Sequence, residues 1–135
     1  MKVIIAGSRS IQDYELVSSI ISNTLATYSI PITQIVSGCA DGVDVLGEQW
    51  ALENDVPVEP FPAKWNDLDV PGAKIKTNRF GNKYNALAGF QRNEEMAKYG
   101  DVLILIWDGK SYGSSDMKKR AIKRGLAVYE YVLKE

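Results

Sequence analysis

Two hydrophobic patterns alternate along the chain. Short unbroken apolar runs, such as residues 3–6 and 102–107, are too short for helices and consist mostly of strand-forming residues. Such runs are typical of strands buried on both faces, as in parallel sheets covered by helices. Between them, apolar residues recur at helical spacing, as they do over residues 13–27. The alternation of strand and helix patterns predicts an α/β fold.

The same reasoning places the other elements. Strands are expected at residues 3–6, 33–36, 57–61, 102–107 and 127–132, and helices at about 13–27, 43–54, 88–99 and 115–124. Prolines at both margins of residues 57–61 favour a strand at the edge of the sheet. Because parallel strands need right-handed crossovers, few topologies fit. We therefore predict a Rossmann-like three-layer sandwich with a mainly parallel five-stranded sheet, ordered 3-2-1-4-5.

Length and composition indicate one domain spanning residues 1–135. At 135 residues the chain is long enough to bury a full core. Residues 62–87 lose all regular patterning and form a long irregular insertion, which is usually functional or mobile. A net charge of −1 gives no global attraction to nucleic acid or acidic membranes. With no long apolar span and no signal peptide, we expect a cytoplasmic protein without membrane association.

Several classes of chemistry are excluded or disfavoured. The chain has no histidine, so it lacks a Ser-His-Asp triad and the commonest zinc ligand. One cysteine, Cys39, excludes an internal disulfide. Neither G-x-x-x-x-G-K-[ST] nor G-x-G-x-x-G is present, which argues against a P-loop NTPase and a standard dinucleotide fingerprint. Asp41, Asp44 and Glu48 are more typical of an exposed helix face than of a metal site, so we expect neither metal nor cofactor.

Three loops follow strands at their carboxyl ends: Ser8–Arg9, Ser37–Gly42 and Asp108–Ser114. In the predicted sheet order they would open on one crevice, where open α/β sheets bind ligands. Glycine permits close backbone approach, and hydroxyls and helix amino ends favour phosphate. Each loop alone could equally be a simple Gly/Ser turn. The candidate ligand-binding residues are Gly7, Ser8, Arg9, Ser37, Gly38, Gly42, Asp44, Arg92, Asn93, Asp108, Gly109, Ser111, Gly113 and Ser114.

Three of the polar residues in or near these loops have competing interpretations. Asp44 could reach a ribose hydroxyl or simply cap a helix. Arg92 could clamp a phosphate or carboxylate through its planar fork, although most helix arginines are only solvated. Cys39 could be a nucleophile, but no histidine is present to activate it, and a small residue in a tight turn is the better interpretation.

At these residues the chain resembles the YspA-like family of the SLOG superfamily, which also contains the Lonely Guy phosphoribohydrolases and the DNA-processing protein DprA. The motifs that carry the resemblance are Val3–Arg9, Ser37–Asp44, Ala88–Gly89 with Arg92, Asn93 and Met96, and Trp107–Ser114. They span nearly the whole chain in order. The resemblance implies a Rossmann-like sheet that binds nucleotides or molecules derived from them. It also suggests that the long insertion, with Lys74, Lys76, Asn78, Arg79 and Lys83, is a cover over the crevice.

Of two catalytic motifs of the Lonely Guy enzymes, this chain matches one and departs from the other. Arg92 and Met96 match the R-K-x-x-M motif of Lonely Guy enzymes, but Met117 stands where their G-G-x-G-T-x-x-E motif has its glutamate. A carboxylate there would stabilise the cationic charge that develops during N-glycosidic cleavage, and methionine cannot. Asp116 is one residue away and would point about 100° away on a helix. Relatives also usually have glycine where this chain has Cys39.

Three functions remain open at this point. The leading one is binding of a phosphorylated nucleoside or ADP-ribose-like molecule, with Arg9 and Arg92 supplying positive charge and Trp65 available to stack on a base. The second is a phosphoribohydrolase, or nucleotide N-glycosidase, that uses Arg92 with Asp116 or Glu95. The third is handling of single-stranded DNA, as the DprA resemblance suggests. The net charge makes nucleic acid an unlikely partner, whereas self-association into a homo-oligomer remains open.

Overall fold

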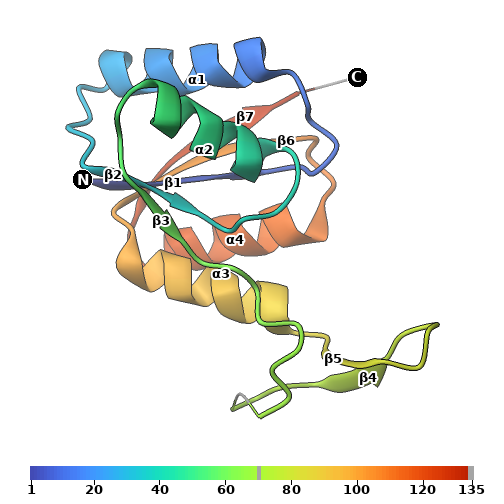
Figure 1. Ribbon diagram of the computed structural model, residues 1–135. Helices are drawn as coiled ribbons and strands as arrows, with labels where there is room; N and C mark the ends of the chain where they lie inside the picture. The colour runs from blue at the N-terminus through green and yellow to red at the C-terminus, as the bar shows by residue number, and fades with distance from the viewer. Residues whose placement is uncertain (70, 134–135) are drawn as a thin grey trace.

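The structure is a computed structural model that describes residues 1–69 and 71–133. Strands and helices alternate around one main sheet (Figure 1). The elements in chain order are β1 (Lys2–Gly7), α1 (Tyr14–Thr27), β2 (Gln34–Ser37), α2 (Val43–Glu53), β3 (Val58–Pro60), β4 (Ile75–Thr77), β5 (Lys83–Asn85), α3 (Ala88–Tyr99), β6 (Val102–Trp107), α4 (Tyr112–Lys123) and β7 (Ala127–Val132).

The main sheet has five parallel strands in the order β3-β2-β1-β6-β7, which confirms the predicted 3-2-1-4-5 order. The proline-flanked strand β3 lies at an edge, as expected. At the centre, β1 pairs with β6 from Val3–Val102 to Gly7–Ile106. A Cβ on Gly7 would lie 1.7 Å from the carbonyl oxygen of Ile106, so only glycine fits where these strands end. The end of β1 is therefore held against β6.

Helices cover both faces of the sheet, as the buried apolar strands require. Figure 1 shows α1 and α2 on one face and α3 and α4 on the other. Alternate residues of β1 divide between two cores: Val3 and Ile5 pack with α1 and α2, whereas Ile4 packs with α3 and α4. Every residue of β6 is buried. The continuous apolar run of β6 thus reflects burial on both sides.

Two local features differ from the sequence expectation. Residues 62–87, expected to be irregular, contain a short antiparallel hairpin of β4 and β5, with Ile75 opposite Asn85. In Figure 1 this hairpin extends away from the sheet and its helices and does not cover the carboxyl ends of the strands. Helix α4 begins at Tyr112, three residues before the expected start, so Gly113 and Ser114 lie in its first turn.

Among the described residues, no helix is both long enough and apolar enough to span a membrane.

Candidate ligand-binding site

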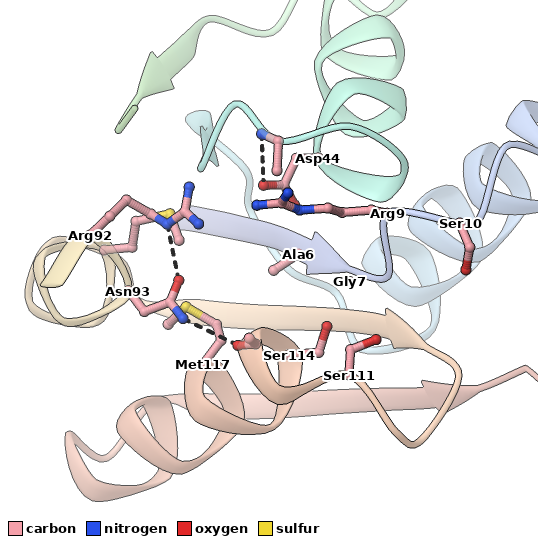
Figure 2. Close-up of a pocket in the computed structure, with 13 residues that line it drawn as sticks. Ala6, Gly7, Arg9, Ser10, Asp44, Arg92, Asn93, Ser111, Ser114 and Met117 are labelled. Atoms are coloured by element: carbon pink, nitrogen blue, oxygen red, sulfur yellow. Dashed lines mark hydrogen bonds between the residues drawn. The ribbon is translucent and has the colours of Figure 1, made fainter. Parts of the chain in front are cut away.

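A cavity of about 410 Å³ lies at the carboxyl ends of β1, β2 and β6 (Figure 2). All three predicted loops contribute to its wall: Arg9 from the first, Ala40 from the second and Ser111 from the third. Helix α3 adds Arg92 and Asn93. The expected convergence of loops far apart in the sequence on one crevice is therefore confirmed. The volume falls within the range of about 300 to 1,000 Å³ that is common for small-molecule sites.

The first two loops are held together by backbone packing at Gly42. This residue has φ +76° and ends the loop at the amino terminus of α2. A Cβ on it would lie 2.3 Å from the Ser8 carbonyl oxygen and 2.6 Å from Cα of Arg9. In addition, the backbone N–H of Val43 donates to the Ser8 carbonyl at 3.3 Å. Glycine is required here both for its backbone conformation and for the close contact between loops.

The first and third loops are joined through Ser8. Its buried hydroxyl lies 3.1 Å from the Ser111 hydroxyl and accepts from the backbone N–H of Asp108 at 2.9 Å. The Asp108 carboxylate in turn accepts from the backbone N–H groups of Lys110 and Ser111. These N–H groups, that of Lys110 first, lower the pKa of Asp108 to about 2. Ser8 and Asp108 thus shape the loop, and of these groups only Ser111 reaches the cavity wall.

Arg92 is fixed by contacts with neutral acceptors. Its Nη1 donates to the carbonyl oxygen of Gly38, and its Nε donates to Oδ1 of Asn93 at 3.1 Å. Burial lowers the pKa of Arg92, although the guanidinium remains charged at neutral pH. A Cβ on Gly38 would lie 2.5 Å from Nη1 of Arg92, so glycine at position 38 makes room for the guanidinium.

Asn93 connects the helices on the lower face of the sheet in Figure 2. While its Oδ1 accepts from Arg92, its Nδ2 donates to the Gly113 carbonyl oxygen at 3.2 Å and to Asp116 Oδ2 at 3.1 Å. Asn93 is buried, and the two bonds from its Nδ2 link α3 to α4. It therefore positions Arg92 and the first turn of α4 beside the cavity.

Asp44 is the acidic group in the cavity wall. It lies in the first turn of α2, only 5% exposed, and its Oδ2 accepts from the Ala40 backbone N–H at 3.2 Å. Gly42, not Asp44, occupies the cap position, so the capping interpretation of Asp44 is wrong. Burial raises the pKa of Asp44 to about 6, against the opposing attraction of Arg92 and Arg9. Figure 2 shows Asp44 close to the Arg9 side chain, above the end of β1.

The predicted residues divide into two groups. Those that line the cavity are Gly7, Arg9, Asp44, Arg92, Asn93, Ser111, Gly113 and Ser114. Those that shape the surrounding loops without lining this cavity are Ser8, Ser37, Gly38, Gly42, Asp108 and Gly109. Ser37, for example, is fully buried and donates to Glu48 at 2.6 Å. Its hydroxyl is therefore used inside the protein.

Five lining residues were not among the predicted ones: Ala6, Ser10, Ala40, Met96 and Met117. Met96 and Met117 are buried in the core and show only a small surface to the cavity. The resemblance pointed to both methionines, but an apolar residue at helical spacing is normally a core residue. Ala40 belongs to a predicted loop and Ser10 directly follows another, so both could have been included on that ground.

The carboxylates suggested for catalysis lie elsewhere. Asp116 bonds to Asn93 and to Nε of Arg120, the latter at 2.8 Å, and does not line the cavity. Glu95 is exposed and lines other hollows on α3. Within residues 1–69 and 71–133, no three side chains of the metal-binding types are grouped so as to hold an ion.

Comparisons with known proteins concern the family and the fold. Residues 1–67 match the model of the YspA, cpYpsA-related SLOG family, over the part that contains β1, β2 and the first two cavity loops. The chain belongs to this SLOG family. The resemblance inferred from the motifs is thereby confirmed. No curated protein sequence matches this SLOG chain.

The fold of the SLOG chain also occurs in a larger protein. The X-ray structure of DNA processing protein A (DprA) from Streptococcus pneumoniae matches it with a TM-score of 0.64 at 20% sequence identity. The match covers 96% of this chain and 49% of the DprA chain, so the SLOG chain spans about half the length of that protein. At this identity the match establishes a shared fold.

Proposed function

We propose that the protein binds a phosphorylated nucleoside or a related sugar phosphate in the cavity at the carboxyl ends of β1, β2 and β6. The observation that carries the proposal is the meeting of three loops around one hollow with two guanidinium groups, Arg9 and Arg92, in its wall. Arginine forks suit phosphate oxygens better than any other side chain. An anion is the ligand class that this charge favours.

The opposite wall adds donors of a second kind. Helix α4 begins beside the cavity, with Ser111 at its cap and Gly113 and Ser114 in its first turn. The free N–H groups of such a turn and the helix dipole favour negative charge. Asp44 is suited to accept hydrogen bonds from sugar hydroxyls, because a carboxylate is purely an acceptor when ionised. The arrangement thus provides for both halves of a sugar phosphate.

Thermal denaturation in the presence of ADP-ribose, AMP, ribose 5-phosphate and inorganic phosphate tests this proposal. A ligand present at 100 times its Kd adds about 2.7 kcal/mol to the free energy of unfolding, which raises Tm by several degrees. We expect this shift in the unsubstituted protein and its loss in R9M. The matched control is R79M, because Arg79 lies on the hairpin loop and contacts Phe80 instead of the cavity. No shift with any of the four compounds would refute the proposal.

A second candidate, cleavage of the N-glycosidic bond of a nucleotide, is favoured by Asp44. It is a cavity carboxylate whose pKa of about 6 suits acid–base chemistry near neutral pH. Met117 still leaves the cavity without the glutamate of Lonely Guy enzymes. Incubation with AMP followed by chromatography separates the two functions: an enzyme releases adenine and loses that activity in D44N, whereas a binding protein returns AMP intact.

A further inference from the structure

A second hollow of about 210 Å³ adjoins the main cavity. One side of it is the Gly38–Ala40 turn, and the other is formed by Pro62, Ala63 and Trp65 at the start of the insertion. Arg9, Ala40 and Arg92 line both hollows. Because 210 Å³ is below the usual range for a whole ligand, this space suits one part of a ligand that continues into the main cavity.

Trp65 differs from the other two tryptophans. Trp50 and Trp107 are 5% and 7% exposed, and their indole N–H groups donate to Ser22 and Glu130. Trp65 instead is 39% exposed and lies in the wall of the hollow. Packing in the core accounts for Trp50 and Trp107, whereas the exposed ring of Trp65 is available to a ligand.

The position of the Trp65 ring is set by its neighbours. The Trp65 carbonyl accepts from the Asn85 backbone N–H at 2.7 Å, which ties it to the end of β5. A Cβ on Gly89 would lie 3.4 Å from Cη2 of Trp65 and 3.8 Å from Nη2 of Arg92. The indole and the guanidinium of Arg92 therefore pack over the same short stretch of α3. The second hollow is thus lined by the aromatic ring of Trp65 and by Arg9 and Arg92, which also line the main cavity.

We infer that this hollow is the base subsite for a nucleoside carrying two linked phosphates and a second sugar, the class to which ADP-ribose belongs. This inference rests on the proposed function. The base stacks on Trp65, the phosphates lie between Arg9 and Arg92, and the second sugar enters the main cavity near Asp44. Stacking on an aromatic ring suits any base, since every base has a π-face, and arginines at the junction match the charge of the phosphates.

The test measures Kd for two ligands, ADP-ribose and ribose 5-phosphate, the latter lacking a base. We expect W65A to weaken ADP-ribose binding about tenfold or more and to leave ribose 5-phosphate binding within about twofold. W65F retains most of the ADP-ribose affinity because it keeps a ring. The matched control is F80A, since Phe80 is an exposed aromatic of the same insertion and lies outside the hollow.

Nuclear magnetic resonance of the indole and backbone N–H groups separates this inference from the proposed function. With ADP-ribose we expect the Trp65 indole signal to shift together with the Ser111–Ser114 amide signals. Shifts of these amides with an unmoved Trp65 signal, or equal effects of W65A on both ligands, would overturn the base subsite alone. If no amide of the cavity responds to either ligand, the proposed function fails and the subsite fails with it.

Discussion

Two groups of charged side chains each include one residue of α3, Glu94 in one and Arg92 in the other, and they differ in how their charges are paired. Between α3 and α4, Arg120 pairs with Asp116 at 2.8 Å and with Glu94 at 3.0 Å, and Arg124 pairs with Glu94 at 2.9 Å. At the cavity, Arg9, Asp44 and Arg92 take part in none of the four ion pairs in the described part of the chain. The charges between α3 and α4 are therefore paired with one another, whereas those at the cavity are not.

The pKa shifts of the two groups show what this difference means. Hydrogen bonds from Arg124 and Arg120 lower the pKa of Glu94, so ionisation of this residue stabilises the fold. Burial raises the pKa of Asp44 to about 6, so its ionisation costs free energy. A buried charge kept at such a cost, beside two arginines and a cavity, is characteristic of functional sites. The paired group holds two helices together, whereas the unpaired group remains available to a ligand.

The largest expected effect comes from R92M. This change removes a charged donor from both hollows, and we expect sugar phosphate binding to weaken about 100-fold, the upper end of the range for hydrogen bonds to charged groups. Isothermal titration calorimetry measures it. The matched control is R120M, which removes an arginine of the paired group and should change Kd by less than about twofold. Equal losses in both variants would show that the two groups do not differ in function.

D44N tests the cost of the buried carboxylate. The folded protein holds the Asp44 proton more tightly than the unfolded chain does, so the free energy of unfolding falls as pH rises from the ordinary value of 3.8 to about 6. The asparagine variant lacks this loss, and we expect it to be more stable by about 3 kcal/mol at pH 7.5. The advantage should disappear as pH falls toward 4. Chemical denaturation at several pH values measures both, and a destabilised variant at pH 7.5 would contradict the interpretation.

E94Q should give the smallest change, with the opposite dependence on pH. It removes the negative charge from two partly exposed ion pairs, and we expect a loss of about 1 kcal/mol at neutral pH after allowance for solvent screening. Because the folded pKa of Glu94 lies below its ordinary value of 4.5, this stabilisation is present above 4.5 and is lost as pH falls through the folded pKa. Chemical denaturation of E94Q at the same pH values as for D44N measures this loss of stability and its dependence on pH. An unchanged difference in strong acid would exclude the charge as its cause.

The sequence predicted the fold better than the details of the site. The predicted bounds of α3, β6 and β7 agree with the structure because apolar runs and spacing mark them directly. The start of α4 was placed too late, since glycine and three serines hid a first helical turn that is anchored by the Asp108 loop. The hairpin of β4 and β5 was missed because its strands are only three residues long and largely exposed.

Within the site, the convergence of the loops followed from sheet order, but the roles of single residues did not. Ser37 and Asp108 are polar like Ser111 but do not line the cavity, and their side chains bond inside the protein, to Glu48 and to the Lys110 backbone N–H. The groups that act on the buried Asp44 carboxyl include Arg92, Ala40 and Arg9 from three separate segments, and the pattern of one helix does not reveal them. Likewise, the acceptor of Arg92 is a backbone carbonyl 54 residues away. Such contacts depend on the folded arrangement.

The tight fit at Gly42 has a consequence for how a ligand is received. Because the backbone of the second loop packs directly on that of the first, and Ser8 bonds to the third, the three loops around the main cavity are linked to one another. We therefore expect recognition to need no rearrangement of the main chain around the main cavity, only adjustment of lining side chains such as Arg9. The main cavity is accordingly formed before a ligand arrives, and binding adjusts only the conformations of the side chains that line it.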